Sequence, residues 1–137
     1  MDALLVVDVQ EDYIGEGRND RRFFYHSGRY TPQLAKGLDV VSGNIFVKQH
    51  ANCFSNTELA RFLRDNNVTG LELVGIDGNY CVAASARAGK RNGFSVLLDQ
   101  KCVEAAKAGR FTRTVDGPCA VPYTHLRAHE TKANLVC

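Results

Sequence analysis

The sequence predicts an α/β fold built on a mainly parallel sheet. Short, continuous apolar runs recur along the chain, as is typical of strands buried in a parallel sheet. The segments between the later runs have the apolar spacing or the small residues of helices. The resulting alternation of strand and helix predicts parallel neighbours joined by right-handed crossovers. With 137 residues, 45% of them apolar, the chain is long enough for one domain with its own core.

Four apolar runs are the expected strands. The first, Ala3–Asp8, is continuous and β-branched, which favours burial on both faces of the sheet. The others are Asn44–Lys48, Leu71–Ile76 and Phe94–Asp99. Because ligands bind at the carboxyl ends of parallel strands, the residues that close these runs are the first candidates for a site.

Two helices are expected between the later strands. Ser55–Asn67 has three apolar residues on one face, a suitable N-cap in Asn56 or Thr57, and two asparagines at its end. Cys81–Gly93 is rich in small residues and ends at a glycine. Its composition suits a helix that lies close against a sheet.

Composition and charge limit the partners of the protein. The net charge of +2 comes from scattered residues, so neither nucleic acid nor a membrane surface is an expected partner. No apolar run approaches the roughly 18 residues of a membrane span, and the first residues do not resemble a secretion signal. We therefore expect a cytoplasmic protein. Its five cysteines are irregularly spaced, which argues against a disulfide framework or a zinc site.

Reactive side chains lie at the ends of three expected strands. Asp8 closes the first and Lys48 the second, and the third runs into the turn that carries Cys81 to the start of a helix. A nearby ammonium and a helix N-terminus both lower the pKa of a thiol, and a carboxylate can move its proton to a leaving amine. Taken singly, each residue has an ordinary structural explanation, such as a turn cap, a solvated lysine or a small buried hydrophobe. Together they predict a nucleophilic site.

Three stretches of the chain also carry a resemblance to a known family. They are LLVVDVQEDY, FVKQHANCFSNTELARFL and ELVGIDGNYCVAASARAGKRNGFSVLLD. They resemble the sequence blocks of the isochorismatase-like cysteine hydrolases, a superfamily that includes nicotinamidases. The resemblance implies a three-layer αβα fold, here shortened, and amide hydrolysis through a covalent acyl-enzyme. It also implies a catalytic triad of Asp8, Lys48 and Cys81.

The same resemblance implies roles for other residues. The Ile76–Asp77 peptide bond would be cis, and the backbone N–H groups of Asp77 and Cys81 would bind the oxyanion. Gln10 and Phe54 match family positions near the substrate and are expected to bind it. A small-molecule substrate is the expected partner, and no cofactor is expected.

The chain departs from the family pattern just before Cys81 and in the stretch 12–43. Gly78-Asn79 replaces the usual Thr-Asp, which removes one carboxylate and predicts a looser loop. The stretch 12–43 is shorter than its family counterpart and lacks an Asp-x-His, so no metal is expected and His26 is interpreted as a surface residue. His50 lies two residues past Lys48, but no role is expected for it.

The last residues lose apolar periodicity. The segment YTHLRAHETKANLVC resembles translated adapter sequence, so we expect the hydrolase domain to span 1–122 and 123–137 to be a non-native or disordered tail. The competing interpretation is a metal site on His125 and His129, which are four residues apart. It is less favoured because no third ligand is evident.

Two functions follow from these observations. The first is a cysteine hydrolase that cleaves a small-molecule carboxamide or a related C–N bond, which the intact triad favours. The second is a truncated, non-catalytic relative that serves as a structural or oligomerising α/β domain, which the shortened pocket wall favours. A short sheet with bare edges would also promote a homo-oligomer.

Overall fold

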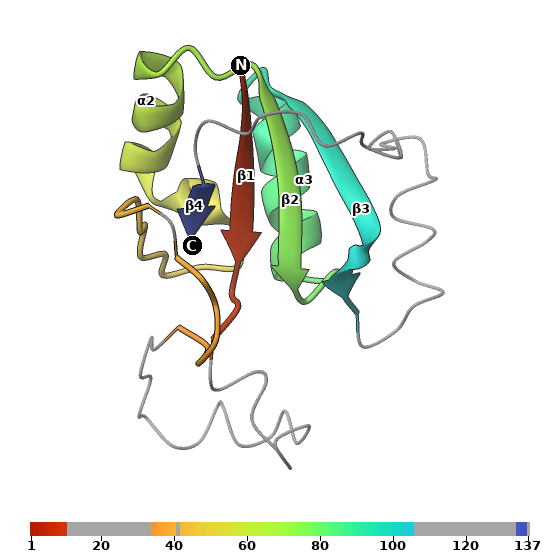
Figure 1. Ribbon diagram of the computed structural model, residues 1–137. Helices are drawn as coiled ribbons and strands as arrows, with labels where there is room; N and C mark the ends of the chain where they lie inside the picture. Colours follow the sequence, from red (N-terminus) through yellow and green to blue (C-terminus); the bar gives the residue numbers. More distant parts are fainter. Residues whose placement is uncertain (11–33, 41, 106–133, 137) are drawn as a thin grey trace.

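The computed structural model describes residues 1–10, 34–40, 42–105 and 134–136. Within these ranges the chain forms a parallel sheet with the strand order β3-β2-β1-β4 (Figure 1). The strands are β1 (Asp2–Val7), β2 (Gly70–Ile76), β3 (Ser95–Glu104) and β4 (Asn134–Val136). The prediction of a parallel α/β fold is confirmed.

Two helices and a 3-10 turn connect the strands. The turn η1 (Cys53–Ser55) and helix α2 (Thr57–Asp65) lie between β1 and β2, and helix α3 (Cys81–Arg91) lies between β2 and β3. Asn56 is the N-cap of α2, and its Oδ1 accepts the Glu58 N–H at 3.0 Å. Both helices begin where the sequence predicts.

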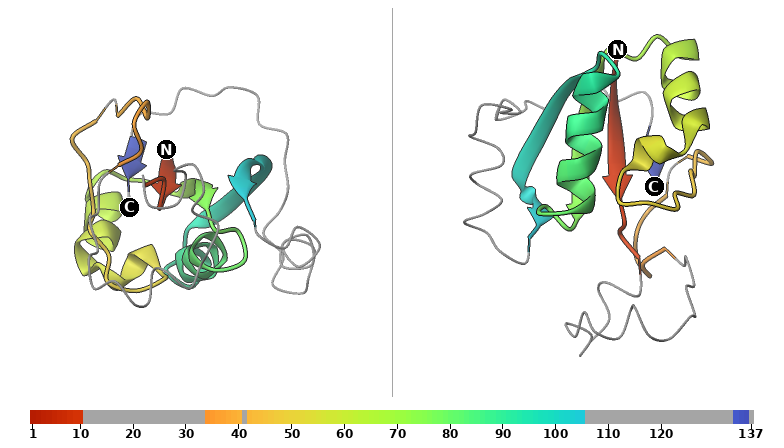
Figure 2. Two further views of the ribbon diagram at one scale, coloured as in Figure 1. Left: turned by 90° about the horizontal axis from the view of Figure 1, so that it is seen from below. Right: turned by 180° about the vertical axis from the view of Figure 1, so that it is seen from behind.

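The core lies between one face of the sheet and the helices. Both helices lie on the same side of the sheet (Figure 2). Alternate residues of β1 and β2 point to that side and are buried, and they pack with apolar residues of the helices: Ala3, Leu5, Val7, Leu71, Leu73, Leu59, Leu63, Val82 and Ala86. The described ranges contain no helix on the other face, so they do not test the expected third layer.

The strand predicted at Asn44–Lys48 is wrong. In this segment only Ile45 has the backbone pairing of an isolated bridge, and the position beside β1 is occupied by β4. The run is not buried on both sides, because Ile45 and Val47 are 51% and 63% exposed. The ring of Phe46 instead packs on Phe62 of α2, with centroids 5.4 Å apart. The segment is therefore attached to a helix.

The chain after Phe94 also differs from the expectation. β3 does not end at Asp99 but continues to Glu104, and its register with β2 shifts between Leu73 and Gly75. Within the predicted tail, Asn134–Val136 forms β4, which pairs in parallel with β1. The boundary at residue 122 stays a prediction. No helix in the described ranges is long and apolar enough to cross a membrane.

Candidate active site

The carboxyl ends of β1 and β2 approach each other closely. Gly75 pairs with Val7 and has φ +123°, and a Cβ at this position would collide with the Val7 carbonyl oxygen. Directly after Val7 the backbone turns at Asp8, which has φ 52°, a left-handed conformation that Asp tolerates better than most residues. The turn leaves the Asp8 side chain buried, with 1% exposed.

Lys48 meets Asp8 at this end of the sheet. Its Nζ lies 2.8 Å from Asp8 Oδ2, and its side chain is 7% exposed. The ammonium also donates to the His50 carbonyl at 3.2 Å and to Cys81 Sγ at 3.8 Å. A carboxylate, an ammonium and a thiol predicted from separate segments of the sequence are thus in contact.

Cys81 is the first residue of α3, as predicted. The turn before it is closed by Asp77, whose carbonyl accepts the N–H groups of Tyr80 and Val82 at 2.9 and 3.1 Å. Asp77 Oδ1 accepts the Asn79 N–H at 2.8 Å. The Ile76–Asp77 peptide bond is cis, as the resemblance implies.

The thiol of Cys81 is held in its protonated form. Burial raises its pKa from 9.0 to about 12, and a hydrogen bond to Asp8 and the charge of Asp8 act in the same direction. The Lys48 ammonium and a hydrogen bond from the Asp77 backbone lower the pKa but do not outweigh these effects. The expectation of a depressed pKa is wrong, because the sulfur is partly withdrawn from water and the adjacent Asp8 carboxylate opposes the effect of the lysine.

Asp8 is placed to take the thiol proton. Apart from the ion pair and the thiol hydrogen bond, neither of its oxygens has a hydrogen-bond partner among the described residues. The carboxylate therefore has lone pairs available on the side of the sulfur. This geometry allows general base chemistry without any further titratable side chain.

Two backbone N–H groups flank the sulfur. The Asp77 N–H donates to Cys81 Sγ. The Cys81 N–H belongs to the first turn of α3, where backbone donors have no partner within the helix. Such donors beside a nucleophile are suited to an oxyanion, and the predicted donors thus lie beside the predicted nucleophile.

The loop from Val47 to Asn56 fixes Lys48 relative to the helices. Asn56 Nδ2 donates to the Val47 carbonyl at 3.0 Å, and the Cys53 N–H donates to Ser85 Oγ at 3.0 Å. Ser85 is fully buried one turn after Cys81. Our sequence reasoning assigned Ser85 no role, although its spacing of four residues from Cys81 places it on the same helix face.

The two residues expected to bind substrate are buried. Gln10 is 7% exposed and forms an isolated antiparallel bridge with Leu34. Phe54 is 9% exposed, and its ring stacks on Phe94 with centroids 5.9 Å apart. Phe54 therefore packs in the core, and substrate binding by either residue stays a prediction.

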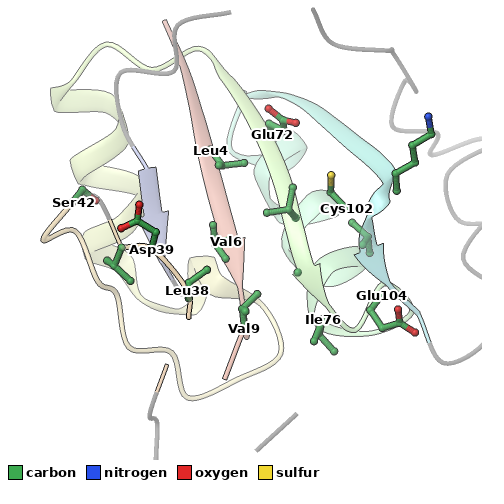
Figure 3. Close-up of a pocket in the computed structure, with 15 residues that line it drawn as sticks. Leu4, Val6, Val9, Leu38, Asp39, Ser42, Glu72, Ile76, Cys102 and Glu104 are labelled. Atoms are coloured by element: carbon green, nitrogen blue, oxygen red, sulfur yellow. The ribbon is translucent and has the colours of Figure 1, made fainter. Parts of the chain in front are cut away.

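A hollow of about 720 Å³ lies on the other face of the sheet, away from α2 and α3 (Figure 3). Its floor includes Leu4, Val6 and Ile76, and Glu72 and Glu104 contribute carboxylates. The hollow is not lined by the three reactive residues, so it is not part of the candidate site.

No three His, Cys, Asp or Glu side chains of the described ranges gather in a way that could hold a metal ion. His26, His125 and His129 lie outside these ranges.

A family model matches most of the chain and shows the family to which it belongs. Residues 24–114 match the family model described as the isochorismatase domain. The chain belongs to the isochorismatase family. No curated protein matches it in sequence.

Solved structures similar to this isochorismatase-family chain have the same fold at low identity. Pyrazinamidase from Pyrococcus horikoshii, solved in complex with zinc, is 21% identical with a TM-score of 0.72, covering 91% of this chain and 99% of that one. Nicotinamidase from Bacillus subtilis is 14% identical with a TM-score of 0.74, covering 90% and 99%. N-carbamoylsarcosine amidase from Thermoplasma acidophilum is 17% identical with a TM-score of 0.63, covering 98% and 94%.

Proposed function

We propose that this chain is a cysteine hydrolase that cleaves the C–N bond of a small carboxamide through a covalent acyl-enzyme. The observation that carries the proposal is the contact of Lys48 Nζ with both Asp8 Oδ2, at 2.8 Å, and Cys81 Sγ, at 3.8 Å. An ion pair buried beside a thiol at a helix N-terminus has no need to exist for packing alone, since burying charges is costly. Its chemistry matches the requirements of nucleophilic catalysis.

In the first half of the reaction Cys81 Sγ attacks the carboxamide carbon. The S–H proton passes to Asp8, a C–S bond forms, and the carbonyl electron pair moves onto oxygen. The N–H groups of Asp77 and Cys81 bind the resulting oxyanion. When the tetrahedral intermediate collapses, the C–N bond breaks and Asp8 returns the proton to the nitrogen. Ammonia or an amine leaves, and the acyl group remains on Cys81 as a thioester.

In the second half water hydrolyses the thioester. Asp8 takes a proton from the water, whose oxygen attacks the acyl carbon. The second tetrahedral intermediate expels the Cys81 sulfur, which receives the proton back from Asp8. A carboxylic acid leaves, and the thiol and the carboxylate are restored.

Lys48 remains protonated in this scheme. Its ammonium forms the ion pair with the buried Asp8 carboxylate and lowers the cost of negative charge on the sulfur. It therefore stabilises negative charge on the Asp8 carboxylate before the proton transfer and on the Cys81 sulfur after it.

Three amides are suitable first substrates: nicotinamide, pyrazinamide and N-carbamoylsarcosine. They follow from the names of the similar solved structures. Release of ammonia by the full chain would be measured for each, alongside Cys81→Ser and the surface control Cys102→Ser. Mass spectrometry of acid-quenched protein would show whether an acyl adduct is on the peptide that contains Cys81, and hydroxylamine should remove that adduct as a hydroxamic acid and restore the free thiol.

The expected result is ammonia release that requires Cys81 but not Cys102, with an acyl mass on Cys81. If no amide acylates Cys81 and none releases ammonia, the alternative of a family relative without this activity is favoured. If Cys81→Ser releases ammonia as fast as the parent chain, the assigned nucleophile is wrong.

A further inference from the structure

The Lys48 segment is positioned by side chains of α2. Residues 44–48 form no strand in the structure, and within them only Ile45 has an isolated bridge, so an extended strand pairing does not place the lysine. The segment is instead held to α2 by the packing of Phe46 on Phe62 and by the hydrogen bond from Asn56 Nδ2 to the Val47 carbonyl. The Val47 carbonyl belongs to the peptide bond that joins Val47 to Lys48, so this hydrogen bond acts directly on the backbone of the lysine.

Asn56 uses both ends of its amide. Its Oδ1 accepts the Glu58 N–H at 3.0 Å and so caps α2, while its Nδ2 donates to the Val47 carbonyl at 3.0 Å. Ser and Asp are equally good N-caps but lack the amide N–H donor. Capping alone therefore does not require asparagine at this position.

We propose that Asn56 is a positioning residue, which couples the start of α2 to the backbone of Lys48 and so sets the distance between the Lys48 ammonium and the Cys81 sulfur. The proposal rests on the proposed function, in which that ammonium stabilises charge on the sulfur. It adds a residue that does not touch the reacting atoms. The separation that it controls is the 3.8 Å between Lys48 Nζ and Cys81 Sγ.

The position of the helix that carries Asn56 is itself fixed. η1 directly precedes it, and the Cys53 N–H of η1 donates to the buried Ser85 Oγ in α3. Cys81 begins α3. If Val47 moved away from Asn56, Lys48 would therefore shift relative to Cys81, because η1 and α3 are held together by the hydrogen bond between Cys53 and Ser85.

Two substitutions separate positioning from capping. Asn56→Ser and Asn56→Asp both keep an oxygen that can cap α2, and both remove the donor to Val47. The serine variant is neutral and controls for the charge that aspartate adds. Asn66→Ser is the matched control, because Asn66 Nδ2 donates to the Phe62 carbonyl at 2.8 Å at the other end of the same helix.

The measurement is the rate of Cys81 alkylation by iodoacetamide at pH 8.5, followed on the full chain by peptide mass spectrometry. Opposite charges at this range shift a pKa by about 1–3 units, so a partly displaced ammonium should slow alkylation about 3- to 10-fold in both Asn56 variants. Asn66→Ser should keep the parent rate. If turnover is detected, kcat should fall by a similar factor with little change in KM.

Three results would overturn the proposal: an unchanged rate in Asn56→Ser, a slower rate in Asn56→Asp alone, or an equal slowing in Asn66→Ser. The first shows that Lys48 is placed without Asn56, the second that added charge is the cause, and the third that loss of helix stability is the cause. Alkylation needs no turnover. Failure of the parent chain to hydrolyse any amide would therefore count against the proposed function and leave this comparison valid.

Discussion

Replacing Asp8 by asparagine should make Cys81 more reactive toward an alkylating agent while abolishing hydrolysis. Asp8 raises the pKa of the thiol through its charge and its hydrogen bond, whereas Lys48 lowers it. Asp8→Asn removes the carboxylate charge and keeps a side chain of similar shape. The thiol then faces the lysine without the opposing carboxylate, and the general base of the proposed reaction is lost.

The size of the effect is set by the carboxylate charge that the substitution removes, because Asp8 hydrogen-bonds the Cys81 thiol and Lys48 is unchanged. At about 4 Å two unit charges interact by about 4 kcal/mol at an effective dielectric constant near 20, and by about 1 kcal/mol in water. Lys48 is largely buried but the thiol is only partly so. The expected decrease in the pKa of Cys81 is therefore about 1–3 units. At fixed pH below the pKa, alkylation should accelerate about 10- to 1,000-fold.

The assay compares the parent chain, Asp8→Asn and the control Asp65→Asn. Asp65 is an exposed residue at the end of α2, so Asp65→Asn makes the same chemical change away from the site. Iodoacetamide labelling of Cys81 would be followed at pH 7.5 by peptide mass spectrometry, and ammonia release would be followed in parallel. Removing one partner of a buried pair costs about 3–5 kcal/mol of stability, so folding of Asp8→Asn must first be confirmed by circular dichroism.

Alkylation of folded Asp8→Asn at the parent rate or more slowly would contradict this prediction. That result would mean that Asp8 does not raise the pKa of the thiol. Hydrolysis, where the parent chain shows it, should decrease at least about 100-fold in Asp8→Asn, as expected for loss of a general base. Unchanged hydrolysis would remove Asp8 from the mechanism.

Other predictions concern the thiol and the backbone around it. Because its pKa is raised to about 12, alkylation of Cys81 should increase about tenfold per pH unit from pH 7 to 10; a plateau below pH 9 would contradict this. Gly75→Ala should cost about 3 kcal/mol or more in urea unfolding, because the added Cβ collides with a β1 carbonyl, whereas Gly43→Ala has open space and should cost little. Ser85→Ala should cost about 1–3 kcal/mol, since it leaves the buried Cys53 N–H without its acceptor; equal midpoints would show that water replaces the hydroxyl.

Asp8 and Cys81 could be placed from the sequence because strong local patterns adjoin them. An apolar run ends at Asp8, and a strand, a glycine turn and a small-residue helix surround Cys81. Parallel neighbours share one carboxyl edge, so the meeting of these two residues needs no knowledge of the rest of the chain.

Lys48 reaches the same edge by a different route than predicted. An apolar run of five residues cannot distinguish a buried strand from an extended segment with one packed face. The place beside β1 is taken by Asn134–Val136, and this pairing joins segments too far apart in sequence for any local pattern to show. The register shift that carries β3 to Glu104 likewise depends on tertiary contacts.

The sign of the thiol pKa shift was not predictable for the same reason. A helix N-terminus and a nearby lysine both suggest a thiolate, but the outcome depends on burial and on whether a carboxylate already pairs with the lysine. In this chain it does, at 2.8 Å. Desolvation is the largest effect and favours the neutral thiol, and the Asp8 carboxylate acts in the same direction and opposes the lysine.

A neutral resting thiol is consistent with the proposed chemistry. Moving its proton to Asp8 exchanges one negative charge between oxygen and sulfur while Lys48 stays positive, so the net charge of the buried site does not change. The energetic cost of the transfer then depends on how strongly the Lys48 ammonium stabilises negative charge on the Asp8 oxygen compared with the Cys81 sulfur. Its Nζ lies 2.8 Å from Asp8 Oδ2 and 3.8 Å from Cys81 Sγ. Reactivity should therefore depend more on where the backbone places Lys48 than on the helix that carries Cys81, which is why contacts of the Lys48 segment with α2 matter to the reaction.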